Sequence, residues 1–162
     1  RTLGEAVGRF LATLDKRVLV LGTGGLSHEP PVPLLAGAPD EIANFLIAGR
    51  NPTPEARAAR QARTIAAGKV YGTPDSPLTP LNPDWDLNFI ETLTSGRLDA
   101  VDAFSVEEIS KAAGRSTHEI RTWVAAFAAL SAAAGPYTAR TDYYRPISEW
   151  IAGYGVVSAQ PA

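Results

Sequence analysis

The feature that most constrains the fold is a short apolar run followed at once by a loop dense in glycine and proline. The run is Arg17-Val18-Leu19-Val20-Leu21, and it ends at Gly22. A β-branched apolar run of this length predicts a strand buried in an α/β sheet. From Gly22 to about Pro33 the chain has three glycines and three prolines, a density that excludes a helix or a central strand. We therefore expect a buried strand that carries a rigid loop at its carboxyl end.

Helical signals surround this strand and outnumber it. Before the run, apolar residues from Leu3 to Leu14 recur at helical spacing and predict an amphipathic helix. Cap residues and apolar spacing predict further helices over residues 39–48, from Thr53-Pro54 to about Val70, from Asn82-Pro83 to Gly96, from the capping box Ser105-x-x-Glu108 to Gly114, and from Ser116-x-x-Glu119 to about Ala133. We expect residues 72–83 to form a rigid connection and the tail, Tyr143 to Ala159, to be irregular with a short strand. The predicted fold class is α/β with helix in excess.

Composition excludes several kinds of function. The 162 residues contain no Cys, which rules out disulfides, zinc ribbons, iron–sulfur clusters and thiolate nucleophiles, and the two His restrict any imidazole-based metal site. A net charge of -2 gives no reason to expect nucleic-acid or membrane-surface binding, and no apolar run approaches the ~20 residues of a membrane span. The chain has no Met and begins at Arg1, so we expect it to be one piece of a longer protein.

His28 is the first candidate for chemistry. It lies just beyond the carboxyl end of the predicted strand, where α/β sheets bind ligands. An imidazole there could act as a general acid or base near neutral pH. The alternative is a loop histidine that only bonds a carbonyl, and from a lone His this structural interpretation is the commoner one.

Glu119 is the second candidate, because its spacing to Trp123 and Phe127 puts it on the apolar face of its helix. A carboxylate turned toward a core needs a partner. It could close the Ser116 capping box or point inward as a metal ligand, and sequence reasoning alone favours the cap. His118 points elsewhere on the helix and is expected to face solvent. Because adjacent helical residues diverge, His28, His118 and Glu119 do not make a complete facial iron site.

Other motifs in the sequence give weaker evidence for a function. Gly22-x-Gly24 lacks the third glycine of a dinucleotide fingerprint, the nucleophile elbow lacks its last glycine, and no Walker sequence occurs. Residues 105–123 are similar to a helix-turn-helix, but their basic residues are matched by acidic ones, so two packed helices are the better interpretation. In the tail, Tyr143 and Arg145 could bind substrate, with Arg145 on a carboxylate, although simple packing of the tail is the commoner explanation.

Several long segments, in order along the chain, resemble one family. They are Leu3-Gly4-Glu5-Ala6-Val7-Gly8-Arg9-Phe10, Gly24-Gly25-Leu26-Ser27-His28-Glu29-Pro30-Pro31-Val32-Pro33, Leu81-Asn82-Pro83-x-Trp85-Asp86, Ser116-Thr117-His118-Glu119-Ile120-Arg121-Thr122-Trp123-Val124-Ala125-Ala126-Phe127 and Tyr143-Tyr144-Arg145-Pro146-Ile147-x-Glu149-Trp150-Ile151-Ala152-Gly153. With these segments the chain is similar to the C-terminal half of class III extradiol catechol dioxygenases, of the protocatechuate 4,5-dioxygenase β-subunit superfamily, that act on carboxyalkyl catechols such as 2,3-dihydroxyphenylpropionate. The resemblance covers nearly all of the chain and is weakest over residues 36–76.

The resemblance implies a non-haem Fe(II) enzyme that uses O2 to open a catechol ring beside its hydroxyls. Glu119 matches the carboxylate ligand of the iron, which overturns the preference for a cap, and His28 matches the acid/base histidine. In the family both iron-binding His lie in an N-terminal half, so we expect residues 1–162 to be a single C-terminal segment of a larger catalytic domain, with a central sheet flanked by helices.

The implied partner is therefore that N-terminal half, without which the segment is expected to be inactive. We further expect a cytoplasmic homo-oligomer that binds neither nucleic acid nor membrane. A superfamily relative without oxygenase activity, acting as a lyase, hydrolase or binding subunit, is the alternative.

Overall fold

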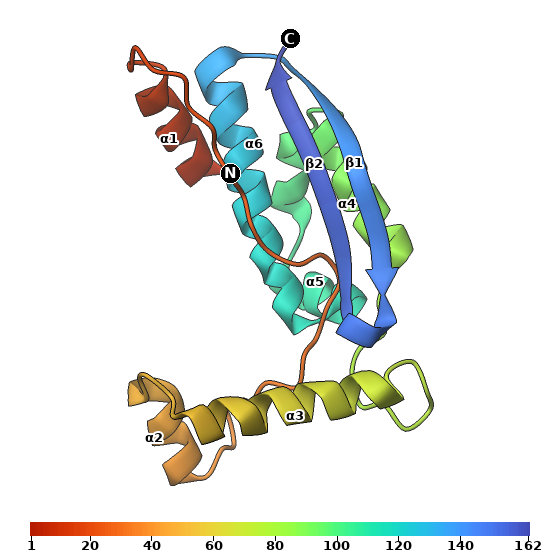
Figure 1. The fold of residues 1–162 in the computed structure, drawn as a ribbon. Helices are drawn as coiled ribbons and strands as arrows, with labels where there is room; N and C mark the ends of the chain where they lie inside the picture. Colours follow the sequence, from red (N-terminus) through yellow and green to blue (C-terminus); the bar gives the residue numbers. More distant parts are fainter.

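Helix α6 (Arg121–Ala134) runs through the middle of the main body and organises what surrounds it. In the computed structural model, which describes all of residues 1–162, α1 (Thr2–Leu11) lies along one side of α6, and a β-hairpin and α4 (Pro83–Thr94) lie on the other (Figure 1). The core forms where these elements meet. Its buried apolar residues are Leu26, Phe89, Ile90, Leu93, Leu98, Ile109, Ile120, Trp123, Val124, Phe127 and Ala128.

Helix α1 packs on α6 through glycine rather than through its apolar stripe. Gly4 and Gly8 are its buried residues, and a Cβ at either position would overlap the backbone of α6. The predicted helix is thus confirmed, but the stripe expected to be buried faces outward, with Leu3 73% and Phe10 63% exposed. Within this chain the close approach of two backbones decides which face of α1 is covered.

The tail is a regular hairpin, so the expectation of an irregular tail with a short strand is wrong. Strand β1 (Tyr137–Ile147) pairs antiparallel with β2 (Ala152–Pro161) along nearly its whole length, with one irregularity between Thr141 and Tyr143. The short 3-10 helix η3 (Ser148–Trp150) joins the strands. Alternate residues of both strands are partly buried, which is the pattern of a sheet with one face on a core.

The predicted helix caps are confirmed at three places and wrong at a fourth. Thr53, Asn82 and Ser105 accept backbone hydrogen bonds at the starts of α3 (Pro54–Val70), α4 and α5 (Val106–Ala113). Ser116 makes no cap, because the chain turns at Gly114 into the 3-10 helix η2 (Arg115–Ile120) and α6 begins only at Arg121. The helix predicted over residues 39–48 is α2 (Asp40–Ala48), and a further 3-10 helix, η1 (Leu98–Ala103), follows α4.

Residues 17–21, predicted to be a buried strand, are extended but belong to no sheet. The hairpin is the chain's one sheet, and it has two strands. A strand needs a neighbour to satisfy its backbone groups, and no other strand in this chain reaches these residues. The α/β class with helix in excess is confirmed, while the expected central sheet amounts to the hairpin alone.

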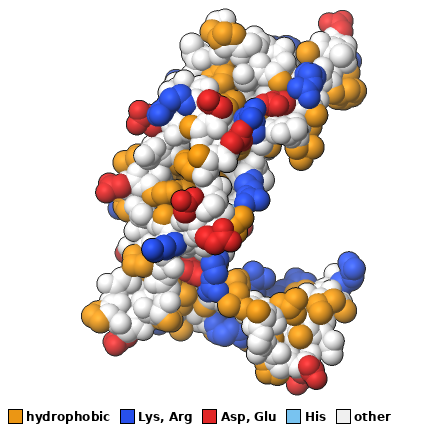
Figure 2. All heavy atoms as spheres, turned by 180° about the vertical axis from the view of Figure 1, so that it is seen from behind, with side chains coloured by type: hydrophobic (Ala, Val, Ile, Leu, Met, Phe, Trp, Pro, Cys, Tyr) orange, Lys and Arg blue, Asp and Glu red, His pale blue; other side chains and the backbone are white.

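Helices α2 and α3 form an arm that projects from the body (Figures 1 and 2). Neither helix has a buried residue. No helix of the chain is both long and apolar enough to cross a membrane.

Candidate functional site

The loop that carries His28 is held in place by the base of the hairpin. The backbone N–H of Gly153 donates to the Ser27 carbonyl at 2.8 Å, and the Leu26 N–H donates to the Gly153 carbonyl at 3.3 Å. His28 itself forms an isolated antiparallel bridge with Ala152. Leu26 and Ser27 are completely buried, so the backbone that presents His28 belongs to the core despite its many glycines and prolines.

A buried carboxylate, that of Asp86 in α4, holds the same loop through Ser27. Its oxygens accept hydrogen bonds from the Ser27 N–H at 2.7 Å, the Ser27 hydroxyl at 2.7 Å and the Tyr144 hydroxyl at 2.9 Å. Burial raises the pKa of Asp86 above its ordinary value, and the hydrogen bonds from Ser27 and Tyr144 oppose that rise. Asp86 thus connects α4, the loop and β1 at one point.

The His28 ring has one nitrogen occupied and one free. Nδ1 lies 2.7 Å from the Leu26 carbonyl oxygen, which can only accept, so in the neutral ring we assign the proton to Nδ1. Nε2 is then a lone-pair acceptor, and it lies 3.6 Å from Oε2 of Glu119. The side chain is only 12% exposed, and a Cβ on Gly25 would come within 2.7 Å of Cε1. The ring is therefore oriented with Nε2 available to give or take a proton.

Glu119 projects from η2 toward the loop rather than into the core. Its Oε2 accepts a hydrogen bond from the Gly25 N–H at 3.0 Å, and its side chain is 58% exposed. The capping-box interpretation is wrong, because this carboxylate bonds the loop and not the backbone of Ser116. The position of Gly24 allows this approach, since a Cβ there would lie 2.6 Å from the Cβ of Glu119. One carboxylate oxygen remains without a hydrogen-bond partner.

His118 lies apart from this pair. Its Nε2 is 2.9 Å from the Ser110 hydroxyl, and its Nδ1 is buried without a partner. The expectation that His118 faces solvent is therefore wrong, because its ring contacts Ser110 of α5. His118 thus lies against Ser110 and not beside His28 and Glu119, and no three His, Asp or Glu side chains are grouped to hold a metal ion.

A second buried carboxylate flanks His28 on the other side. Glu29 is 5% exposed and accepts hydrogen bonds from Thr79 and from the guanidinium of Arg115. Burial, the largest single influence, acts to raise its pKa, but the bonds from Thr79 and Arg115 together hold the pKa of Glu29 below its ordinary value. His28 is thus fixed between two residues that are each anchored in the interior.

Tyr143 and Arg145 are not brought to this site. Tyr144 between them turns inward to Asp86, so its two neighbours lie on the opposite face of β1. Both are exposed, and no hydrogen bond or ion pair joins either of them to His28 or Glu119.

Sequence reasoning missed Asp86, although a signal was present. Asp86 lies three, four and seven positions before Phe89, Ile90 and Leu93, which are all buried on one face of α4. The same test that singled out Glu119, a carboxylate on an apolar helix face, would have found it. Applied to Asp86 the test finds a buried group, and applied to Glu119 it finds an exposed one.

Comparison with known proteins gives a consistent result. A family model described as the catalytic LigB subunit of aromatic ring-opening dioxygenase matches residues 1–155. A protein of Azotobacter vinelandii named 2,3-dihydroxyphenylpropionate/2,3-dihydroxicinnamic acid 1,2-dioxygenase is 80% identical over 160 residues, which are 99% of this chain and 51% of the relative.

Two further relatives with this name extend the pattern. The protein numbered 1 of Dechloromonas aromatica is 76% identical over 98% of the chain and 51% of its own length. That of Cupriavidus necator is 61% identical over all 162 residues, again 51% of its own length. The chain spans about half the length of the curated relatives it matches.

Proposed function

The chain belongs to the family of catalytic LigB subunits of aromatic ring-opening dioxygenases, and on that premise we propose that it supplies part of the active site of an extradiol dioxygenase. The proposed substrate is a carboxyalkyl catechol such as 2,3-dihydroxyphenylpropionate, which is the compound in the names of its relatives. The observation that carries the proposal is the pairing of Nε2 of His28 with an exposed carboxylate, that of Glu119, at 3.6 Å.

His28 is the acid/base group in this proposal. Ring opening beside two hydroxyls requires a catechol proton to be removed and later returned. Since Nδ1 is held by the Leu26 carbonyl, Nε2 is the atom that moves the proton. The buried loop keeps this atom in one place, which is the preorganisation that proton transfer needs.

Glu119 is the proposed metal ligand of this chain. One of its oxygens accepts from Gly25 and the other is unbonded, an arrangement that leaves a carboxylate oriented and available. The residues of this chain do not by themselves make up a metal site, because no three suitable side chains converge. Fe(II), when bound by a complete set of ligands, would supply a Lewis acid for the catechol and electrons for dioxygen.

The missing ligands are proposed to come from the polypeptide that corresponds to the other half of the relatives' length, the N-terminal half. The active protein is then an assembly of the two halves. The cytoplasmic location and the homo-oligomer expected from the sequence stay predictions. Tyr143 and Arg145 are retained as substrate-binding candidates for the assembled protein only, and Arg145→Gln tests them by raising KM without a matching fall in kcat.

Reconstitution tests the proposal. The chain is mixed with the N-terminal half of the Azotobacter vinelandii relative, Fe(II) and 2,3-dihydroxyphenylpropionate without oxygen, and oxygen is then admitted. A yellow ring-opened product is expected. Glu119→Ala should abolish both bound iron and product, whereas Glu107→Ala, at an exposed glutamate of α5 without a partner, should leave them unchanged.

The same assay separates His28 from Glu119. His28→Ala is expected to retain iron and to lower kcat by about 10²–10⁴-fold, the usual contribution of a positioned acid or base. Full activity of Glu119→Ala would refute the ligand assignment. An assembled protein that binds no iron and gives no product would favour a superfamily relative without oxygenase activity.

A further inference from the structure

Residues 17–22 form an extended segment with two unsatisfied edges. None of their backbone N–H or carbonyl groups makes a hydrogen bond with another backbone group, although both neighbouring parts of the chain are well bonded. The segment is nevertheless fixed at its end, where a Cβ on Gly22 would lie 2.6 Å from the Thr122 carbonyl oxygen of α6. The ribbon is extended over these residues, and neither strand of the hairpin pairs with them (Figure 1).

The side chains of this segment are apolar on both faces and exposed. Val18, Leu19, Val20 and Leu21 are 47, 79, 38 and 76% exposed. Isolated exposed leucines are ordinary, but four consecutive apolar residues on an extended backbone are not. Such a run is typical of a strand that is covered on both sides.

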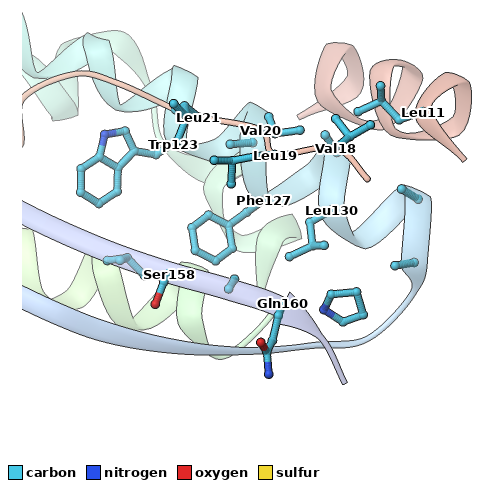
Figure 3. Close-up of a pocket in the computed structure, with 18 of the residues that line it drawn as sticks. Leu11, Val18, Leu19, Val20, Leu21, Trp123, Phe127, Leu130, Ser158 and Gln160 are labelled. Carbon is cyan, nitrogen blue, oxygen red and sulfur yellow. The ribbon is translucent and has the colours of Figure 1, made fainter. Parts of the chain in front are cut away.

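An apolar groove of about 690 Å³ lies beside the segment. Trp123, Phe127 and Leu130 of α6 line its floor, and residues 155–161 of β2 line its far wall. Figure 3 shows Leu19 and Phe127 between the extended segment and the β2 side chains Ser158 and Gln160. Within the sheet β2 pairs only with β1, and its second edge is bonded only at its base, to Leu26, Ser27 and His28. Along the groove, over residues 155–161, that edge is free as well.

We propose that this groove, between residues 17–22 and β2, is a docking site for a β-strand. The strand comes from the polypeptide that corresponds to the N-terminal half of the relatives. The inference rests on the proposed function, because it assumes that such a polypeptide assembles with this chain. An added strand would pair with an open edge and cover the apolar side chains in one step, as in other cases of β-strand addition. The length fits, since six extended residues span about 20 Å, an ordinary strand.

Three observations favour this occupant over a second copy of the chain. The curated relatives are about twice as long as the chain, so a polypeptide of similar size remains to be placed. A symmetric pair of segments 17–22 would satisfy one edge but leave the floor of the groove and the edge of β2 open. The outward apolar stripe of α1, with Leu3 and Phe10 exposed, also needs a cover larger than one strand.

Hydrogen exchange tests the docking directly. The probe is the N-terminal half of the Azotobacter vinelandii relative, added to the 162-residue chain. The amides of residues 17–22 should exchange freely in the chain alone and at least 100-fold more slowly in the complex. Protection in the chain alone, or a complex in which these amides stay unprotected, would overturn the proposal.

A charge in the groove gives an independent measurement. Leu19→Asp should weaken binding of the probe at least tenfold, whereas Leu35→Asp, at a leucine that is 53% exposed outside the groove, should bind like the parent chain. Because Leu19 is 79% exposed, its replacement is not expected to unfold the chain, and circular dichroism checks this. Unweakened binding of Leu19→Asp would also overturn the proposal.

The two proposals fail separately. A complex with protected amides that cleaves no catechol supports the docking site and contradicts the proposed function. Ring cleavage by a complex whose residues 17–22 remain unprotected supports the proposed function and contradicts the docking site.

Discussion

Replacement of Asp86 tests whether the loop that presents His28 is held from the interior. Asp86 is 0% exposed and accepts three hydrogen bonds, two from Ser27 and one from Tyr144. Asp86→Ala removes every one of these acceptors at once. Asp86→Asn keeps the size of the side chain and one acceptor oxygen, so the two variants separate loss of hydrogen bonds from loss of charge.

The expected destabilisation can be worked from those contacts. In Asp86→Ala the buried N–H and hydroxyl of Ser27 lose their acceptor, and each unsatisfied group costs about 1–3 kcal/mol. Removing a carboxylate whose burial raises its pKa returns part of this. We expect a net loss of about 2–4 kcal/mol, which lowers Tm by about 5–15 °C for a chain of this size. For Asp86→Asn we expect a loss of about 1 kcal/mol, because Tyr144 can reverse its hydroxyl to accept.

Urea unfolding followed by tryptophan fluorescence, at several pH values, provides the assay. Because the pKa of Asp86 is raised in the folded state, the folded chain holds the proton more tightly, so this group lowers stability as pH rises from about 4 through the folded-state value. Asp86→Asn should lack that decline. A stability of Asp86→Ala within about 0.5 kcal/mol of the parent, or a larger loss in Asp86→Asn than in Asp86→Ala, would refute the reasoning.

Two further predictions concern the neighbours of this site. The pKa of Glu29 is lowered, so its contribution to stability is present above about pH 4 and is lost as pH falls through the folded-state value. Glu29→Gln should therefore flatten the acid limb of a curve of stability against pH. An unchanged limb would exclude the bond between Glu29 and Arg115 as its source. A Cβ on Gly153 would overlap Oδ2 of Asp86, so Gly153→Ala should cost about 1–3 kcal/mol in urea unfolding. That cost should shrink in the Asp86→Ala background, whereas additive losses in the double variant would show that the two residues do not meet.

Local signals account for what the sequence predicted well. The starts of α3, α4 and α5 follow from Thr53, Asn82 and Ser105, because a cap bonds backbone groups only two or three residues away. The stop of α4 near Gly96 follows in the same way, since that residue takes a φ of 77°. Each of these interactions is complete within a few residues, so no distant partner can overrule it.

Signals that depend on distant partners failed. Ser116-x-x-Glu119 has the form of a capping box, but Thr117 donates to the Ala113 and Leu26 carbonyls and Glu119 bonds Gly25, which lies 94 positions away in the chain. The hairpin was missed because its alternation is weak in a stretch rich in tyrosine and glycine. The expectation of an exposed His118 fails because the group that contacts its ring, the Ser110 hydroxyl, belongs to another helix.

The prediction for residues 17–21 is neither fully right nor fully wrong, and its outcome concerns the whole candidate site. Their pattern is that of a buried strand, and the structure gives them the extended backbone of one without the burial. The loop that follows directly is, in contrast, fully built, with Leu26 and Ser27 at 0% exposure. The core of this chain thus holds His28, the proposed acid/base group, while residues 17–21 and one oxygen of Glu119 stay exposed. In the proposed assembly His28 is therefore in place before the second polypeptide binds. Assembly would then add metal ligands and a sheet to a histidine that is already oriented, and His28 should keep its contact with Leu26 in both states.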